Sequence, residues 1–247
     1  MMRKSSLLGP FFLGLSFTSC ATIHQPVTTA PWENFGKGAT TVGLSSGWAF
    51  YGADAHAVGK SGALLGEEGD DTTDLKPNYG AALSVRHLVT DQVALGVIVE
   101  HRSFDPDPIA PLSATLTADS FETWHYILTG RYYLDPFTES KRWRAFLGLD
   151  LSYIPDVPLG DVLVEYPNGF PSETVNVTGS EYWALGAVVG VSYQLSDNWS
   201  WDLATFYEYA ITTGNATVAF DSLGGSTAEM ALRPEGLIVA TGVTYAF

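Results

Sequence analysis

The stretch LIVATGVTYAF (237–247) alternates between two kinds of side chain. One parity carries Leu237, Val239, Thr241, Val243, Tyr245 and Phe247, and the other carries Ile238, Ala240, Gly242, Thr244 and Ala246. Successive side chains of a β-strand point to opposite faces, so this pattern predicts a strand. A terminal strand in water tends to fray, and its open edge invites aggregation. We therefore expect this strand to close a barrel and to turn one face to lipid.

The composition limits the classes of protein to consider. Charged residues make up 16% of the 247 residues, against about 25% in soluble domains. There are 27 acidic and 12 basic residues, with a formal net charge of -15. Nucleic acid is excluded as a partner, because phosphate binding needs clustered Lys and Arg. An acidic surface instead suits cations or cationic partners.

The N-terminus has the pattern of an export signal. The basic start MMRK, the apolar run LLGPFFLGLSF (7–17) and the small residues after it predict a signal peptide over residues 1–19. The apolar run is shorter than the ~20 residues of a membrane-spanning helix, and no later run approaches that length. A helical membrane protein is therefore not expected.

Cys20 is the only cysteine. LSFTSC (15–20) resembles the lipobox of bacterial lipoproteins, in which the Cys is lipidated and becomes the first mature residue, although Phe17 stands where that family usually has Leu. Two outcomes stay open: lipidation of Cys20, or an ordinary cut nearby that removes it or leaves it free. Residues 20–36 have little periodicity and are expected to form an N-terminal linker.

Alternating stretches recur through the rest of the chain. Eight candidate strands lie at 39–51, 78–88, 93–104, 120–134, 143–154, 180–195, 199–211 and 235–247. Short connections (89–92, 135–142 and 196–199) alternate with long ones near 52–77, 105–119, 155–179 and 212–234. This layout predicts an all-β fold over residues 37–247: an eight-stranded antiparallel up-and-down transmembrane β-barrel with periplasmic turns and long external loops.

The two faces of these strands decide between a lipocalin-like soluble barrel and a membrane barrel. One face is apolar and aromatic, with residues such as Leu147, Leu185 and Val189, and its Trp residues lie toward the strand ends. The other face is mostly Gly, Ala, Ser and Thr and contains no Lys. A water-facing sheet would carry Lys and Glu, whereas a narrow lumen needs small side chains. We therefore expect the apolar face to point outward, to lipid.

The strand count, the alternation of turns and the final TYAF resemble the small eight-stranded outer-membrane barrels of the OmpA/OmpX type. The resemblance implies a place in the bacterial outer membrane, in contact with its lipid and lipopolysaccharide. In that class the barrel assembly machinery recognises a C-terminal strand ending in Phe. The resemblance therefore implies that Tyr245 and Phe247 form the assembly signal.

Charges of both signs fall on the small-residue face and are expected to pair inside the lumen, because an unpaired buried charge is costly. Two roles stay open for them: a plug of salt bridges, or a polar path that makes a narrow channel for small solutes or ions. The predicted lumen network comprises Arg86, Glu100, Arg102, Arg131, Arg144, Asp150, Asp202 and Glu208.

The long loops are acidic, most densely in GEEGDDTTD (66–74). Divalent cations are candidate partners there, because oxygen ligands suit them, but the spacing does not match an EF-hand loop. No metal site and no cofactor is predicted. The most direct interpretation is a structural or surface-interaction role carried by the acidic extracellular loops.

EHRSF (100–104) offers an enzymatic alternative. His101 and Ser103 share the outward parity near the external rim, and Glu122 would lie opposite His101 if the connecting loop is symmetric. A hydroxyl, an imidazole and a carboxylate can form a hydrolytic triad. The arrangement resembles outer-membrane lipid A deacylases, except that Phe104 stands where that family has an Asn that helps to hold the oxyanion.

Overall fold

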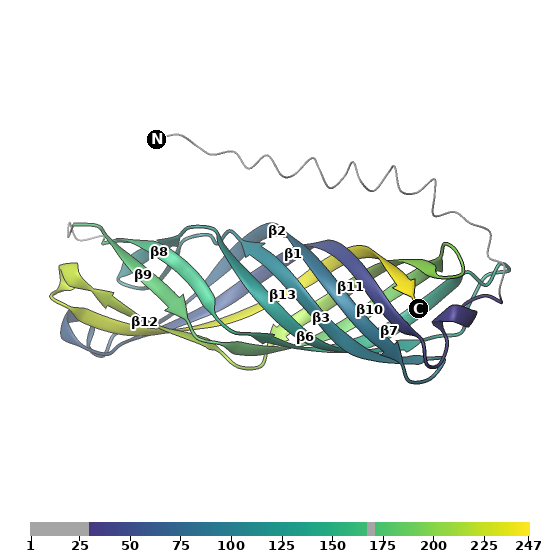
Figure 1. The fold of residues 1–247 in the computed structure, drawn as a ribbon. Coiled ribbons are helices and arrows are strands. Elements are labelled where there is room, and N and C mark those ends of the chain that lie inside the picture. Colours follow the sequence, from purple (N-terminus) through teal and green to yellow (C-terminus); the bar gives the residue numbers. More distant parts are fainter. Residues whose placement is uncertain (1–29, 167–170) are drawn as a thin grey trace.

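A closed ring of eight antiparallel strands forms the body of the molecule. The computed structural model describes residues 30–166 and 171–247. The ring runs β1-β2-β3-β6-β7-β10-β11-β13, and β13 pairs back with β1. Its strands are β1 (Thr40–Gly59), β2 (Glu68–Leu88), β3 (Val93–Phe104), β6 (Phe121–Tyr133), β7 (Trp143–Ile154), β10 (Tyr182–Gln194), β11 (Trp199–Ala210) and β13 (Ser226–Ala246). The predicted eight-stranded up-and-down barrel is confirmed (Figure 1).

Helical structure is minor. The described residues contain the 3₁₀ turns η1 (Glu33–Phe35), η2 (Gly62–Leu64) and η3 (Asp221–Leu223). Within residues 30–166 and 171–247, no helix has the length and apolarity to cross a membrane.

The predicted long loops are largely strands, and this part of the prediction is wrong. β1, β2 and β13 continue well past the predicted ends at 51, 78 and 235. The other connections hold β4 (Ile109–Leu112), β5 (Ala114–Ala118), β8 (Val157–Glu165), β9 (Glu173–Gly179) and β12 (Gly214–Phe220). β12 pairs with the extension of β13, and β4-β5-β8-β9 form a second antiparallel sheet.

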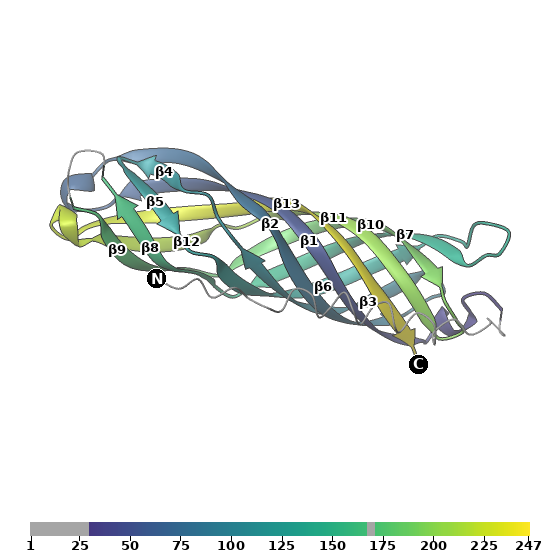
Figure 2. The ribbon, with the colours of Figure 1, turned by 90° about the horizontal axis from the view of Figure 1, so that it is seen from above.

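These extra strands lie at the end of the molecule away from the C-terminus (Figures 1 and 2). We call this part the head, and define it as the described residues of 52–77, 105–119, 155–179 and 212–234. Its interior is a cluster of buried apolar side chains that includes Val164, Val177 and Met230. The head is therefore a packed β-structure continuous with the barrel wall.

The continuation of β1 into the head follows from its inner row. Tyr51, Ala53, Ala55 and Ala57 are all buried and alternate with Gly52, Asp54 and His56, which are half-buried or exposed. β2 follows it through a shift in register, since Ala49 pairs with Asn78 but Tyr51 pairs with Leu75. The shift inserts one extra residue into β2 beside Pro77, and a bulge tolerates a proline because its missing amide need not pair there. This break in alternation hid the outer half of β2 in the sequence.

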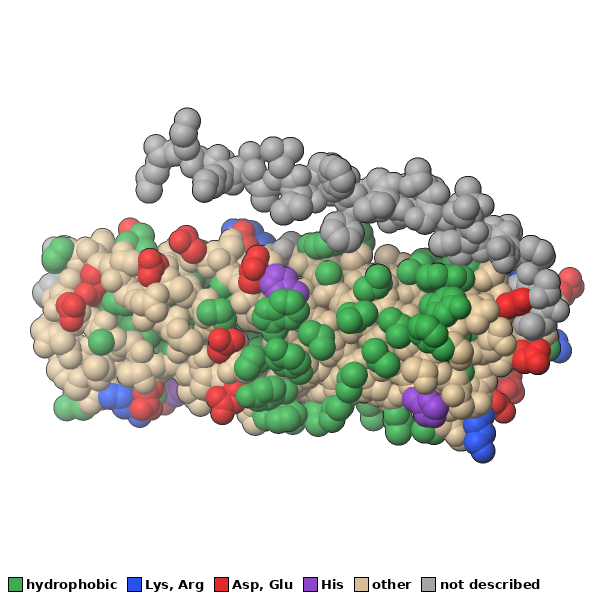
Figure 3. Space-filling view, viewed as in Figure 1, with side chains coloured by type: hydrophobic (Ala, Val, Ile, Leu, Met, Phe, Trp, Pro, Cys, Tyr) green, Lys and Arg blue, Asp and Glu red, His purple; other side chains and the backbone are tan. Residues whose placement is uncertain are grey.

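The apolar face of the barrel points outward, as predicted. Leu147, Leu185 and Val189 are 51%, 48% and 55% exposed, whereas Arg144 on the opposite face is only 5% exposed. Figure 3 shows apolar side chains gathered over the barrel and acidic side chains spread over the head. An exposed apolar belt of this kind is stable only against lipid, and the alternative of a soluble carrier is therefore ruled out.

Two groups of aromatic side chains border the belt. Near the short turns, Trp143 packs against Tyr193 with ring centroids 4.8 Å apart, and Trp199 packs against Tyr245 at 5.0 Å. Toward the head, Tyr153 packs against Trp183 at 4.9 Å. Amphipathic rings are favoured at the two membrane–water interfaces. The belt between these groups therefore marks the membrane-spanning part.

Residues 30–36, the described part of the predicted linker, pack across the mouth of the barrel at the short turns. Trp32 and Phe35 are buried in a cluster with Ala246. The backbone amide of Trp32 donates to Gln194 Oε1 at 3.0 Å, and its indole Nε1 donates to the carbonyl oxygen of Lys141 at 3.0 Å. Two aromatic anchors thus fix this end of the predicted linker to the barrel.

Candidate functional site

A group of buried polar side chains crosses the interior where the barrel meets the head. Nη2 of Arg102 lies 2.8 Å from Oε2 of Glu100, and its Nη1 lies 3.0 Å from Oε1 of Glu208. The hydroxyl groups of Tyr51 and Ser152 both donate to the Glu208 carboxylate, at 2.8 and 3.1 Å. We call this group the junction cluster, and define it as Tyr51, Glu100, Arg102, His125, Ser152 and Glu208.

Half of the junction cluster was missed in the sequence. The charged members Glu100, Arg102 and Glu208 belong to the predicted lumen network, and the structure brings all three together. Tyr51, Ser152 and His125 were not assigned to the network. Each of them lies on the inner parity of its strand and is buried, and this parity was the available signal.

The cluster is hydrogen-bonded on most sides. Every member is buried, and a buried ion pair is tolerated when hydrogen bonds of this kind satisfy most of its polar groups. His125 accepts or donates a hydrogen bond with Thr123 at 2.9 Å, and its Nδ1 lies 3.9 Å from Glu208. The rings of Phe104 and Phe121 stack beside it, with centroids 5.3 Å apart. Charged and aromatic side chains together fill the interior at this level.

A second ion pair lies deeper in the barrel. Nη1 and Nη2 of Arg131 contact the two carboxylate oxygens of Asp150 at 2.6 and 3.0 Å, a bidentate arrangement that fixes both side chains. Arg144 has no carboxylate partner among the described residues. Its Nη2 donates to the carbonyl oxygen of Asp91 at 2.7 Å, and its guanidinium lies over the rings of Tyr133 and Trp32, at 4.7 and 5.2 Å from their centroids.

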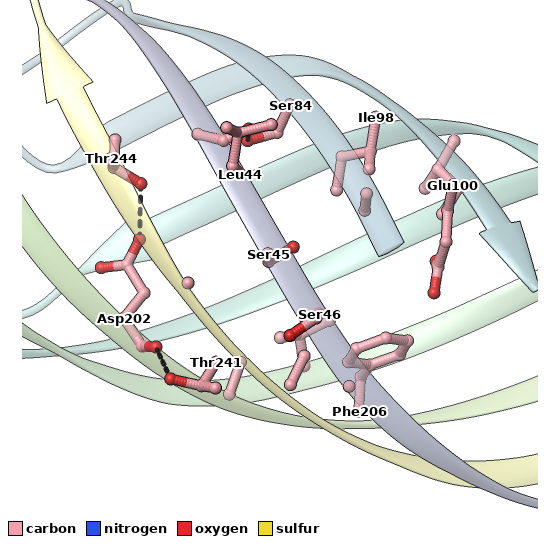
Figure 4. Close-up of a pocket in the computed structure, with 18 of the residues that line it drawn as sticks. Leu44, Ser45, Ser46, Ser84, Ile98, Glu100, Asp202, Phe206, Thr241 and Thr244 are labelled. Atoms are coloured by element: carbon pink, nitrogen blue, oxygen red, sulfur yellow. Dashed lines mark hydrogen bonds between the residues drawn. The ribbon is translucent and has the colours of Figure 1, made fainter. Parts of the chain in front are cut away.

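Arg86 and Asp202, the last two predicted network residues, border a cavity of about 70 Å³ in the lumen. Figure 4 shows Asp202 held by Thr244, whose hydroxyl donates to Oδ2 at 2.8 Å, and by Thr241, whose hydroxyl donates to its backbone carbonyl at 3.2 Å. Within the described part of the chain, Arg86 and Asp202 form no ion pair with each other. A cavity of this size, lined in part by polar side chains, has room for a few water molecules.

The exterior of the head is strongly acidic. The segments 52–77, 105–119, 155–179 and 212–234 carry 15 Asp or Glu against three Lys or Arg, so most of the net charge of the chain lies there. Lys60 pairs with Glu229 at 2.9 Å, and Lys76 lies between Asp105 and Asp107 at 3.5 and 3.3 Å.

Several of these acids hold the head together. The Asp107 hydrogen bond and the charge of Asp105 raise the pKa of Lys76. His56 contacts Asp70 at 2.7 Å and Glu68 at 3.6 Å. In the described ranges, no group of three or more His, Cys, Asp or Glu has a geometry that could hold a metal ion.

The three candidate catalytic residues lie together on the outer rim. Nε2 of His101 is 3.3 Å from Oε2 of Glu122. The register differs from the expected one, however: Glu122 is directly opposite Ser103, and Trp124 is opposite His101. Glu122 reaches His101 diagonally, because the pairing of β3 with β6 is shifted by two residues from the expected register. Phe104 follows Ser103 in the chain, and its side chain is buried. It therefore offers no outward group for an oxyanion.

The predicted assembly residues end the closing strand. Tyr245 pairs with Val42 of β1 and with Trp199 of β11, and its ring lies 4.9 Å from that of Phe247. Phe247 is 74% exposed, and its backbone amide donates to Thr40. Recognition by the assembly machinery stays a prediction. Cys20 and the predicted signal peptide lie outside the described residues.

No protein-family model and no curated protein sequence matches the chain. Among solved structures, the outer membrane protein OprG from Pseudomonas aeruginosa is similar, with a TM-score of 0.57 and 13% identity over 86% of this chain and 98% of that one. This is the fold of a small outer-membrane β-barrel. The outer membrane protease OmpT from Escherichia coli gives a TM-score of 0.50 and 10% identity over 85% and 97% of the two chains. Neisserial surface protein A gives 0.39 and 18% over 85% and 100%. With its lipid-facing belt, this chain has the fold of an eight-stranded outer-membrane barrel, and identities this low concern the fold alone.

Proposed function

We propose that this barrel is a non-enzymatic surface-interaction protein whose head binds a cationic partner. The observation that supports the proposal is a packed head that carries 15 acidic and three basic residues on a membrane-anchored barrel. Of these acids, only Glu68, Asp70, Asp105, Asp107 and Glu229 contact a His or Lys side chain among the described residues. The rest project a negative field that attracts and orients a positively charged surface.

The construction of the head also favours binding. β1, β2 and β13 run unbroken from the barrel into the head, and the second sheet covers a shared apolar core. Binding to a surface that is already ordered does not require the entropy loss of folding flexible loops. The acids therefore present a fixed charge pattern, whether the partner is a basic protein, a basic peptide or a divalent cation.

The lumen supports a scaffold role better than a channel. The junction cluster, the Arg131–Asp150 pair and the aromatic anchor Trp32 place buried side chains at three levels of the interior. An eight-stranded barrel is just wide enough for such side chains to fill it. A silent planar bilayer agrees with this role, whereas stepwise conductance would support the narrow channel instead.

The test compares removal of charge from the head with removal of charge from the opposite end of the molecule. In the head variant, Asp54→Asn, Asp74→Asn, Asp161→Asn and Glu165→Gln neutralise four exposed acids that contact no basic side chain among the described residues. In the control variant, Glu33→Gln, Asp135→Asn and Glu139→Gln neutralise acids at the opposite end. Each protein is placed in nanodiscs of zwitterionic lipid and titrated with fluorescent nona-lysine.

We expect the head variant to bind nona-lysine at least tenfold more weakly at 50 mM salt, and the control variant to bind within twofold of the unmodified protein. The affinity of the head variant should also depend less on salt concentration than that of the unmodified protein, because fewer charges take part. Equal weakening in both variants would mean that net charge alone attracts the peptide, and would overturn the proposal.

A hydrolase is the second candidate, and the contact of His101 with Glu122 at 3.3 Å favours it. Their position at the membrane rim suits an ester of a membrane lipid as substrate. Release of acyl chains from lipid A by the purified protein, abolished by Ser103→Ala, would support this activity. No release by either protein would leave the surface-interaction role.

A further inference from the structure

The far end of the head contains a second cavity, separate from the lumen, with a volume of about 200 Å³. It lies between η2, the β4–β5 hairpin, the end of β8, and η3. Its walls are mostly apolar. The lining residues are Ala63, Leu64, Glu67, Leu112, Ser113, Ala114, Leu116, Tyr166, Phe220 and Leu223. We call it the tip cavity.

Hydrogen bonds around the tip cavity fix the positions of the elements that form its walls. Ser226 accepts from the amide of Ala63 at 2.9 Å and donates to the carbonyl of Leu223 at 2.6 Å, which joins η2 to η3. Glu173 accepts from the amide of Ser222 at 3.0 Å and from the hydroxyl of Tyr166. Burial and this hydrogen bond raise the pKa of Tyr166, so the hydroxyl keeps its proton and the brace persists across the ordinary pH range.

The floor of the tip cavity is the core of the head. Leu64, Leu116 and Phe220 are buried members of that core and are 5%, 8% and 3% exposed. The polar side chains of the lining have hydrogen-bond partners: Ser113 donates to Glu67 at 3.3 Å, and Tyr166 donates to Glu173. A buried water needs two to four polar partners, so these walls favour an apolar occupant. A carboxylate at the edge also disfavours an anion.

The volume of the tip cavity also limits the size of the molecule that can occupy it. A closed apolar cavity of about 150 Å³ lined by aliphatic and aromatic side chains binds benzene in another protein. At about 200 Å³, the tip cavity accommodates a single ring with a small substituent. We propose that the tip cavity binds a small neutral apolar molecule of that size, reached from the extracellular side. The packed core and the junction cluster beneath it make this a binding site and not a route through the membrane.

Because an apolar probe also dissolves in lipid, binding is followed through the NMR signals of the protein and not through those of the probe. Protein with methyl-labelled Leu is placed in nanodiscs and titrated with fluorobenzene. We expect saturable shifts of the Leu64, Leu116 and Leu223 methyl signals. Leu163, on the outer surface of the head, should stay unchanged, and lipid-facing Leu147 should shift only linearly.

Ala114→Phe fills the tip cavity and should weaken fluorobenzene binding at least tenfold, while Leu163→Phe, which adds the same ring outside, should leave it within twofold. If Ala114→Phe does not fold, Ala63→Phe fills the mouth from an exposed position. Linear shifts at all Leu methyls, unchanged affinity in the filled variant, or tighter binding of benzylammonium or benzoate than of fluorobenzene would each overturn the proposal. None of these results depends on binding of nona-lysine by the exterior of the head.

Discussion

The barrel and the head share the strands β1, β2 and β13, yet their polarity is opposite. Along β1, the outer row passes from Leu44, Trp48 and Phe50 in the barrel to Asp54 and His56 in the head. In β13, the inner row passes from Met230 and Leu232 in the head to Ala240 and Gly242 in the barrel. Side-chain direction is conserved within each strand, while the residue types exchange faces. The boundary of the membrane can therefore be located from the point of exchange.

The reason is that each region is solvated differently. In the barrel, lipid surrounds the outside, so charges must lie in the lumen and pair there. In the head, water surrounds the outside, so the apolar side chains fill the interior as in a soluble protein. The junction cluster lies where these two arrangements meet, and it seals the polar lumen from the apolar core above.

The largest effect on stability should come from a substitution in the junction cluster. Arg102→Met leaves two buried carboxylates, those of Glu100 and Glu208, without their cation. Removing one partner of a buried pair costs about 3–5 kcal/mol. Urea unfolding in lipid vesicles, followed by Trp fluorescence, measures the change.

The triple variant Arg102→Met, Glu100→Gln and Glu208→Gln is the control for that change. It should recover most of the lost stability, because no unpaired charge remains. If Arg102→Met alone unfolds at the same urea concentration as the unmodified protein, the cluster does not stabilise the boundary.

A smaller effect should appear when one substitution is made in both regions. Leu149 is 64% exposed on the barrel and Leu163 is 39% exposed on the head. Leu149→Arg places a charge in lipid and should cost about 2–4 kcal/mol. Leu163→Arg places it in water and should stay within about 0.5 kcal/mol. Similar costs from the same urea titration would show that the head also lies in lipid.

The smallest effect compares two isoleucines at the same level of the molecule. Ile154, at the end of β7, is fully buried in the head core, and Ile211, directly after β11, is 50% exposed. Ile154→Val should cost about 0.5–1.5 kcal/mol, as in other close-packed cores, and Ile211→Val close to nothing. Exchange of the amide protons of β8 and β9 reports the difference. Equal protection in the two variants would contradict a packed head.

Local alternation was sufficient to predict the barrel. β3 and β7 begin and end at the predicted residues, 93–104 and 143–154, because each is a single uninterrupted strand between turn residues. The outward direction of Leu147, Leu185 and Val189 was also predictable, since the other face has no Lys and is mostly small.

The head was not predictable from local pattern. β4 has only four residues, and prolines stand within or beside β4 and β8, at Pro106, Pro108, Pro111 and Pro155, so these segments have the composition of loops. They become strands through pairing with segments far along the chain, as when β5 pairs with β8. Pairing between distant segments leaves little trace in any one of them.

The candidate site shows the same limit. The sequence placed Arg131 and Asp150 on one face, but only the register, in which Asp150 lies opposite Thr129, shows that they meet diagonally. Tyr51 stood at the predicted end of a strand. Its role became visible only once β1 was seen to continue.

The unbroken strands also have a mechanical consequence. About 11 residues of β13, from Ser226 to Gly236, stand above the lipid-facing belt, and at ~3.3 Å per residue with a tilt near 40° they raise the far end by roughly 25–30 Å. That height is similar to the thickness of the hydrocarbon layer itself. An approaching cell or macromolecule therefore touches this projection before the lipid surface. A pull on it loads many strand hydrogen bonds in parallel shear, without a hinge at the membrane.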